Sequence, residues 1–318
     1  MSNHSQRYLR EVPALDDVLA SHELIKPYIH RTPVLSSRLI NEAAGANVYF
    51  KCENFQKIGA FKMRGAMNTA LRLTPEEIRQ GLATHSSGNH AQAVARTAQL
   101  LGTKSYIVMP DTSPKSKVAA TKGYGANVFF CENTLAAREA KLREVIEQTQ
   151  ATFIHPYDNY NVIAGQATAA KELHEDIPDL DVIIAPIGGG GLMSGTALIT
   201  RYLRSEASVY GAEPELVDDA YRSFKTGALQ RNNRIDTIAD GLRTNLSDKT
   251  FNIIRHYLDD IFTVSESGII AAVRLINERM KIIIEPSSAV PLAAILKNKP
   301  IFNGKAVGVI LSGGNVDL

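Results

Sequence analysis

Hydrophobic residues recur along this chain with two periods that alternate from one end to the other. Apolar positions three and four residues apart predict amphipathic helices, at residues 15–29, 90–101, 116–122, 134–148, 162–173, 192–203, 266–281 and 287–296. Short runs rich in Val, Ile and Phe predict strands, at residues 47–52, 82–84, 105–109, 127–131, 152–154, 181–186, 209–212, 261–264 and 306–311. Residues 214–248 show weaker periodicity and a more polar character.

This alternation of strand and helix is typical of an α/β fold in which helices flank parallel sheets. The runs VIIAPI (182–187) and AVGVIL (306–311) are apolar, as expected for strands that are buried on both faces. A length of 318 residues allows two domains or one large α/β unit. The sequence therefore predicts parallel sheets flanked by helices, without an internal repeat.

Composition narrows the class of protein further. Hydrophobic residues make up 44% of the chain, charged residues 21%, and the net charge is +2, so neither a nucleic acid nor an anionic membrane is an expected partner. The two cysteines, Cys52 and Cys131, lie in strand-like runs, where we expect both to be buried and reduced. The polar segment 1–17 does not resemble a signal peptide, and no apolar run reaches about 18 residues, so we expect a cytoplasmic protein.

One lysine stands out in the segment ENFQKIGAFKMRGA, residues 53–66. Lys62 follows Phe61 at the point where a helical pattern begins. Apolar surroundings disfavour the ammonium form of a lysine and yield an amine that is nucleophilic enough for a Schiff base. Most single lysines are solvated surface residues, so this segment carries weight only together with three others.

The other three segments are loops that follow predicted strands. Ser86–His90 opens a helix, whose free amides suit a carboxylate or a cofactor oxygen, although Ser and Asn also serve as ordinary helix caps. Gly188–Gly191 joins a buried strand to a helix and could wrap a phosphate, the alternative being a flexible turn. It is neither GxGxxG nor a Walker motif, which disfavours a dinucleotide or a nucleoside triphosphate. Ser312 ends the last strand, where its hydroxyl could face a ring nitrogen or form a plain turn.

A nucleophilic lysine, a phosphate loop, an amide-and-hydroxyl loop and a strand-end hydroxyl together describe a pyridoxal phosphate pocket. The chain resembles the fold-type II pyridoxal-phosphate enzymes, specifically the group of serine racemases, threonine dehydratases and threo-3-hydroxyaspartate dehydratases. The resemblance covers about residue 30 to the end and depends on the motifs GAFKMRGA, SSGNHAQA, HPYDNYNVIAGQ, PIGGGGLMSG, TIADG, IIEPSSA and LSGGNVD. It implies a two-domain α/β fold like that of the tryptophan synthase β subunit. A small mobile domain (80–158) would close on a large, discontinuous one (1–79 and 159–318).

The resemblance also implies a role for individual residues. Lys62 would hold the cofactor as an imine and remove the α-proton of the substrate. Other positions would contact the cofactor: Phe61, Asn89, Gly188, Gly189, Gly190, Gly191, Glu285 and Ser312. A third set would bind the substrate: Ser86, Ser87, Asn89, His90 and Arg138. For Glu285 the plainer alternative is a carboxylate at the entry to a helix before Pro286.

A serine at position 312 favours one reaction type, because a hydroxyl stabilises a protonated pyridine ring poorly. We therefore expect β-elimination of water from L-serine, L-threonine or L-threo-3-hydroxyaspartate, which yields a 2-keto acid and ammonia. Ser87 matches the second acid/base of serine racemases, so racemisation of serine could accompany elimination or be the main activity. Alternatively, Ser87 simply lines the pocket. Hydroxyaspartate would need a cation for its second carboxylate, for which Arg138 and His90 are candidates.

A second group of residues resembles a cation site of the racemases and hydroxyaspartate dehydratases. Glu213, Asp219 and the carbonyl of Val217 offer oxygen ligands suited to Mg²⁺, Mn²⁺ or Ca²⁺, although an acidic pair in a loop is more commonly a solvated turn. We expect the cation to stiffen the large domain.

Partners and regulation are expected from family likeness alone. We expect a homodimer, and nucleotide activation stays open because three positions match a nucleotide site, namely Lys57, Gln92 and Tyr124. The sequence ends at Leu318, so neither the C-terminal extension of mammalian racemases nor the regulatory domain of biosynthetic threonine dehydratases is expected. Two further functions, β-replacement as in cysteine synthase and cofactor binding without catalysis, are less favoured by the intact lysine and loop motifs.

Overall fold

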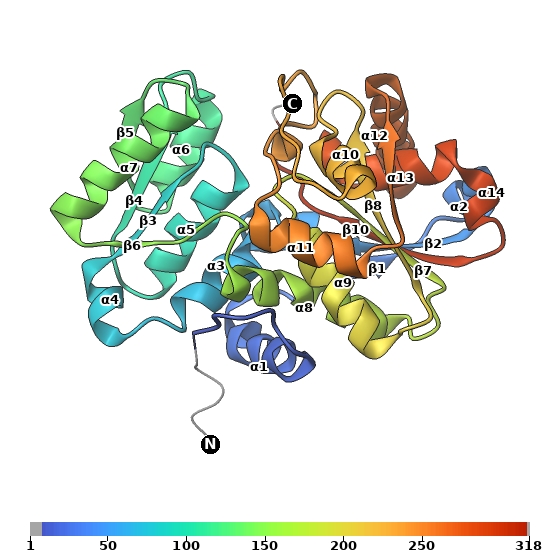
Figure 1. Ribbon diagram of the computed structural model, residues 1–318, viewed down its shortest axis with the longest axis horizontal. Helices are drawn as coiled ribbons and strands as arrows, with labels where there is room; N and C mark the ends of the chain where they lie inside the picture. Colours follow the sequence, from blue (N-terminus) through green and yellow to red (C-terminus); the bar gives the residue numbers. More distant parts are fainter. Residues whose placement is uncertain (1–7, 317–318) are drawn as a thin grey trace.

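The computed structural model describes residues 8–316, in which two sheets stand side by side (Figure 1). Both sheets are mostly parallel and are flanked by helices, which confirms the predicted α/β fold class. Asp317, the last residue of the LSGGNVD motif, lies outside the described residues. Among the described residues, no helix is both long and apolar enough to cross a membrane.

The larger sheet has six strands in the order β1-β2-β10-β7-β8-β9. Only β1 runs antiparallel, as a short edge against β2. Every residue of the central strand Val182–Pro186 is buried, as the apolar run predicted. The strands are β1 (Val34–Leu35), β2 (Asn47–Cys52), β7 (Val182–Pro186), β8 (Ser208–Pro214), β9 (Asp260–Val264) and β10 (Ala306–Leu311).

Helices cover both faces of this sheet and enclose a separate apolar core on each. One core is formed with α1 (Leu15–Ile25), α8 (Tyr160–Asp176), α9 (Gly191–Leu203), α10 (Asp219–Thr226) and α11 (Asp248–Tyr257). The other core is formed with α2 (Arg38–Ala44), α12 (Glu266–Met280), α13 (Pro286–Lys297) and α14 (Lys299–Phe302).

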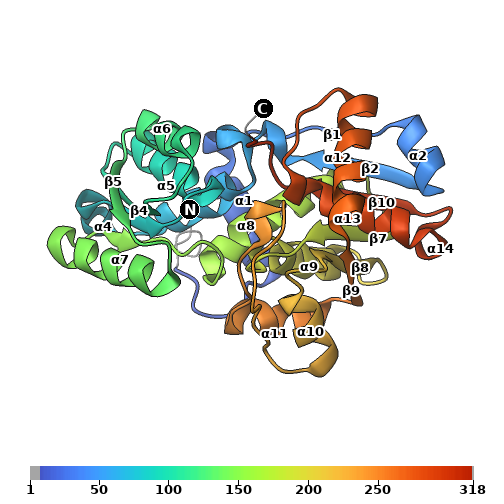
Figure 2. The ribbon, with the colours of Figure 1, turned by 90° about the horizontal axis from the view of Figure 1, so that it is seen from above.

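The smaller sheet has four parallel strands in the order β5-β4-β3-β6 and lies apart from the larger one (Figure 2). Its strands are β3 (Leu82–His85), β4 (Ser105–Pro110), β5 (Asn127–Cys131) and β6 (Thr152–Phe153). The flanking helices are α4 (Pro75–Gln80), α5 (Asn89–Leu100), α6 (Lys115–Gly123) and α7 (Leu135–Thr149). Helix α3 (Lys62–Ala70) packs against both α5 and α8 and so joins the two bodies.

Two local predictions were wrong, and some helices were not predicted. The helix expected at 15–29 ends at Ile25, and a 3₁₀ turn containing a proline follows at Lys26–Tyr28. The weakly periodic stretch 214–248 contains helix α10, which is too short for its period to stand out. Cys131 is only half-buried because β5 is the edge strand of the smaller sheet, whereas Cys52 is buried as expected; both thiols are unbridged.

Candidate functional site

Lys62 is the first residue of helix α3, and its side chain is half-buried. Lys62 Nζ donates a hydrogen bond to the carbonyl oxygen of Pro156 at 2.7 Å and lies 5.1 Å from the centre of the Phe61 ring. Burial lowers the pKa of the amine to about 8, although the carboxylate of Glu285 opposes this shift. The amine is therefore deprotonated far more readily than that of a solvated lysine.

The glycine loop, Gly188–Gly191, runs from β7 into α9 along Tyr157, the residue after Pro156. A Cβ atom on Gly189 would lie 2.3 Å from the Tyr157 ring. Gly190 has a φ of 85° and caps the helix without any side-chain acceptor for the first amides. Gly189 and Gly190 therefore have no room for a Cβ atom, and the amides of the loop remain suited to a phosphate beside Lys62.

The loop between β3 and α5 lies at a second helix N-terminus. Helix α5 begins at Asn89, and its N-cap residue, Gly88, has no side chain to accept from the first turn. Ser86 Oγ accepts from the Gly88 amide at 3.2 Å, whereas Ser87 is half-buried and has no hydrogen-bond partner for its hydroxyl among the described residues. An ordinary N-cap cluster is therefore not what this loop forms, and an anion could bind its amides.

Asn89 connects this loop to the larger sheet. Its Nδ2 donates to both carboxylate oxygens of Glu285, at 3.2 and 3.0 Å, and its Oδ1 accepts from Asn315 at 2.8 Å. Glu285 stands at the N-cap position of α13 but does not cap that helix with its side chain. Burial raises the pKa of Glu285 to about 7, and the hydrogen bond from Asn89 opposes this rise.

Ser312 is buried where β10 ends, and it belongs to the same network. Its Oγ lies 3.1 Å from Ser288 Oγ, and its carbonyl accepts from the amide of Phe61 at 3.0 Å. Ser288 in turn accepts from the amide of Gly313 at 2.8 Å. The loop that begins at Ser312, called the serine loop below, is thus hydrogen-bonded directly to Phe61, the residue before Lys62.

Sequence reasoning missed the pairing of Asn89 with Asn315 and the presence of Ser288 in this network. It also missed two histidines, of which His155 lies near Lys62. Burial lowers the pKa of His155 to about 3, and burial together with nearby Arg138 lowers the pKa of His85. His85 directly precedes the SSGNH motif, and His155 begins the HPYDN motif. The fold brings the two rings together on either side of Phe153.

The two cations considered for a second substrate carboxylate differ sharply. His90 is buried, its Nε2 lies 2.8 Å from the carbonyl of Ile154, and burial holds its pKa well below the usual value. Arg138 is half-buried on α7, with a 3.4 Å hydrogen bond from its Nε to the carbonyl of Thr134 and an electrostatic effect on His85. Only Arg138 carries a positive charge at neutral pH.

Glu213 and Asp219 form a separate acidic group at the end of β8. Glu213 accepts from the amides of Ala220 and Tyr221, and Asp219 Oδ2 accepts from the amide of Leu246 at 2.8 Å. Burial, together with the charge of Asp219, raises the pKa of Glu213 well above its usual value. Within residues 8–316 no group of three or more His, Cys, Asp or Glu side chains could hold a metal, so any cation here would use two carboxylates and the carbonyl of buried Val217.

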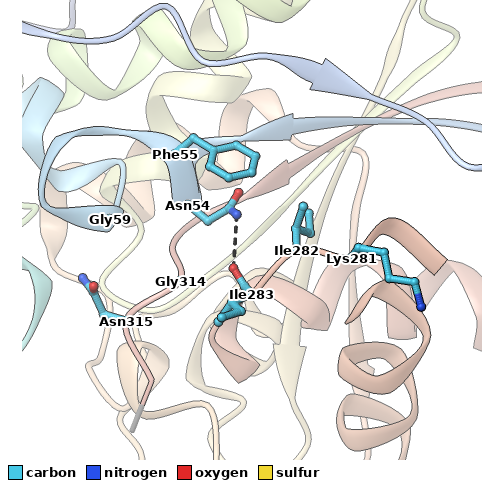
Figure 3. Close-up of a pocket in the computed structure, with 8 residues that line it drawn as sticks. All are labelled: Asn54, Phe55, Gly59, Lys281, Ile282, Ile283, Gly314 and Asn315. Carbon is cyan, nitrogen blue, oxygen red and sulfur yellow. Dashed lines mark hydrogen bonds between the residues drawn. The ribbon is translucent and has the colours of Figure 1, made fainter. Parts of the chain in front are cut away.

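A cavity of about 420 Å³ lies behind the serine loop and is lined by Asn54, Gly59, Ile283 and Asn315 among others (Figure 3). Asn54 Nδ2 crosses it to donate to the carbonyl of Ile283 at 3.1 Å. Asn315 is shared between this cavity and the Asn89 network. The cavity does not contain Lys62, but it is one side chain away from the network described above.

Comparisons with known proteins agree with this geometry. A family model described as pyridoxal-phosphate dependent enzyme matches residues 25–313. A beta-hydroxyaspartate dehydratase of Paracoccus denitrificans is 48% identical over 96% of this chain and 98% of its own length. A crystal structure of serine racemase from Dictyostelium discoideum is 50% identical, with a TM-score of 0.92 over 96% of this chain and 99% of the other. A crystal structure of T.th. threonine deaminase is 42% identical, with a TM-score of 0.92 over 96% and 99%.

Proposed function

Since the chain belongs to the family of pyridoxal-phosphate dependent enzymes, we propose that it removes water from a small β-hydroxy amino acid to give a 2-keto acid and ammonia. The substrates are L-serine, L-threonine or L-threo-3-hydroxyaspartate. The observation that carries the proposal is the position of the Lys62 amine, with a pKa near 8, against Pro156 in a segment whose next residue packs on the glycine loop.

The residues fit the cofactor that the family implies. Lys62 would be the attachment point, the Gly188–Gly191 amides would hold the phosphate, and Asn89 and Ser312 would contact the ring oxygen and nitrogen. Glu285 would lie beside the ring through its bond to Asn89. When bound, pyridoxal phosphate supplies an aldehyde for the amine and a ring that withdraws electrons from the substrate Cα.

The chain itself would bind the substrate and move its protons. The amides of the α5 N-terminus, with Ser86, Ser87 and Asn89, would bind the α-carboxylate, because that helix end lacks a side-chain cap. Lys62 would accept the α-proton, which is favoured by its lowered pKa. The loss of hydroxide from Cβ then requires a proton, and the buried, partly protonated carboxyl of Glu285 is a nearby source of it.

Among the three candidate substrates we favour hydroxyaspartate, because Arg138 offers a positive charge for its second carboxylate. The second carboxylate of hydroxyaspartate needs a positive charge, and His90 is neutral with its Nε2 already bonded to Ile154. Arg138, half-buried and beside His85, is the charged group that remains. Replacing Arg138 with methionine should therefore lower kcat/KM for hydroxyaspartate by about 100-fold while changing that for L-serine much less.

Serine racemisation is the second candidate, and the hydroxyl of Ser87 favours it. Ser87 has no hydrogen-bond partner among the described residues and so could return a proton to the substrate on the face opposite Lys62. Racemisation requires such a second acid, whereas elimination does not. Ser87→Ala should therefore abolish D-serine formation and leave pyruvate formation within about threefold.

The deciding experiment is a panel of L-serine, D-serine, L-threonine and L-threo-3-hydroxyaspartate with keto acid and chirality readouts. Lys62→Ala is the control, and it should lose at least about 1,000-fold in kcat and lose the borohydride-stable pyridoxyl adduct. Absence of that adduct from the wild-type protein would refute the proposal. Formation of keto acid without D-serine would support the lyase activity and exclude the racemase activity.

We also propose, from family likeness, a divalent cation at Glu213, Val217 and Asp219, and a homodimer. Two carboxylates whose pKa values are raised by burial support the cation, and the small donor set suits an ion that keeps several waters. Nucleotide activation remains a proposal for the region of Lys57, Gln92 and Tyr124. Addition of ATP with and without Mg²⁺ to the substrate panel tests it.

A further inference from the structure

Arg64 is a fully buried arginine in the first turn of α3, two residues after Lys62. Its guanidinium forms two forks. Nε and Nη2 donate to the two oxygens of Glu53, at 2.7 and 2.8 Å, and Nη1 and Nη2 donate to the two oxygens of Glu172, at 2.9 and 2.8 Å. Nη1 also donates to the hydroxyl of Thr168 at 3.1 Å. Both planar edges of the guanidinium are therefore occupied by carboxylates.

The two carboxylates belong to separate elements and are held by further partners. Glu53 follows β2 and accepts from the hydroxyl of Thr32 at 2.6 Å. Glu172 lies in α8 and accepts from buried Lys51 at 2.7 Å. Lys51, Glu53, Arg64 and Glu172 thus form a clamp of two positive and two negative side chains, and His22 Nε2 also lies 3.2 Å from Glu172 Oε1. The clamp ties α3 to a strand end on one side and to α8 on the other.

Stability alone does not account for such a clamp. Burying four charges costs about as much desolvation energy as their pairing returns, so a well-packed apolar cluster would serve a core equally well. What an ionic cluster offers in addition is geometry, because a bidentate guanidinium fixes distance and direction together.

The clamp fixes the direction of Lys62. Residues two apart on an α-helix are separated by about 200° around its axis and so lie on nearly opposite sides. Arg64 therefore holds the side of α3 opposite to the one from which the Lys62 amine reaches Pro156. The adjoining helix permits little sideways movement, since a Cβ on Gly165 would lie 2.7 Å from the carbonyl oxygen of Arg64. The clamp then controls how far α3 slides and turns along α8.

We infer that Arg64, through its two carboxylate forks, is a positioning residue that places the Lys62 amine for reaction. This inference rests on the proposed function, in which Lys62 is the reacting amine. Lysine at position 64 keeps the charge but cannot form two forks, so helix α3 is free to shift by a fraction of its rise per residue. A displacement of about 1 Å in a reacting group costs up to about 100-fold in rate.

The test is Arg64→Lys, with Arg201→Lys as the matched control. Arg201 also donates to a carboxylate, that of Asp259, and to backbone carbonyls, but it does so on α9 away from Lys62. Arg64→Lys should lower kcat by about 10- to 100-fold with KM changed less than about threefold, at a temperature well below unfolding. The rate at which the apoprotein regains the bound-cofactor absorbance should fall in parallel. Arg201→Lys should change neither quantity by more than about twofold.

Glu172→Gln provides a second variant that keeps the side-chain shape and removes one fork. It should show the same loss of kcat and of reconstitution rate, to a smaller degree. If either clamp variant unfolds at a lower temperature but keeps wild-type kcat and wild-type reconstitution, the positioning role is wrong and the clamp is purely structural. Failure of the proposed function looks different, because the wild-type protein itself would then lack the pyridoxyl adduct at Lys62.

Discussion

The two sheets differ in how completely their helices enclose them. In the larger sheet the central strand β7 and the first ten residues of the adjoining helix, Gly191–Thr200, are buried throughout. In the smaller sheet α6 buries only Thr121, and α7 buries only Leu142 and Val145. The centre of the larger body is enclosed, whereas the smaller body is open to solvent along two of its helices.

The residues proposed for catalysis divide between these bodies according to their tasks. Lys62 and the glycine loop, which would hold the cofactor, are built on or against the enclosed body. Ser86, Ser87 and Arg138, which would bind the substrate, come from the open one. Regions with fewer packed contacts open and close at lower free-energy cost, so this division favours a fixed cofactor and a mobile substrate clamp. The domain boundary at 80–158 remains a prediction.

The strongest test of this contrast replaces one glycine with alanine in each of the two bodies. A Cβ on Gly189 would lie 2.3 Å from the Tyr157 ring, whereas a Cβ on Gly123 of α6 meets no atom within 4 Å. Gly189→Ala should therefore weaken pyridoxal phosphate binding by about 10- to 100-fold, because overpacking costs about 1–3 kcal/mol. Gly123→Ala should leave binding unchanged. Titration of the apoprotein followed by absorbance measures both.

An equal loss of affinity in the two variants, or none in Gly189→Ala, would contradict the contrast. Thermal unfolding of each apoprotein serves as the control for folding. Gly123→Ala should unfold at or slightly above the wild-type temperature, since alanine restricts the unfolded chain and favours the helix.

Removal of the proposed cation should affect the enclosed body only. Burial raises the pKa of Asp219 to about 6, so without a cation the folded state holds more protons than the unfolded state, and stability falls as pH rises from about 4 through about 6. A bound cation favours the ionised acids and cancels this loss. EDTA should therefore cost roughly 2 kcal/mol of unfolding free energy at pH 8 and much less at pH 5.

Denaturant titration with EDTA, with and without added Mg²⁺, measures this difference. Asp219→Asn should abolish the EDTA effect, while Asp259→Asn, a half-exposed partner of Arg201, should retain it. Hydrogen exchange should increase in residues 228–247, whose Asn232 and Leu246 bond to Asp219, and not in the smaller sheet. An EDTA effect of the same size at pH 5 and pH 8 would rule out the carboxylates as its origin.

The sequence predicted what depends on local pattern. The period of the apolar residues located most strands, and the strand–glycine–helix order located the glycine loop after β7. Lys62 was recognisable because its neighbours in the chain are also its neighbours in space, as with Phe61. These features need no knowledge of how distant segments meet.

What escaped prediction depends on long-range pairing. Asn89 and Glu285 are 196 residues apart, and Arg64 and Glu172 are 108 apart. No periodicity relates such positions, and a buried charge looks like a surface charge in a sequence. The half-buried state of Cys131 escaped for the same reason, because only the strand order shows β5 to be an edge.

The smallest expected effect concerns the link between the two bodies. Lys117 of α6 forms an ion pair with Asp240, which lies beside Gly241 near the glycine loop. Both side chains are partly exposed, so the pair is worth at most about 1 kcal/mol. If it helps the open body to close on the substrate, Lys117→Met should lower kcat/KM by about three- to fivefold, mainly through KM, and leave the unfolding temperature within about 2 °C.

Lys141→Met is the matched control, because Lys141 pairs with Glu144 on its own helix and cannot link the two bodies. A double-mutant cycle with Asp240→Asn isolates the pair, and the double variant should be no worse than either single one. Additive losses would show that Lys117 and Asp240 act separately. In that case the Asn89–Glu285 contact holds the open body instead, and variants of that contact would be needed to test whether one half is fixed and the other mobile.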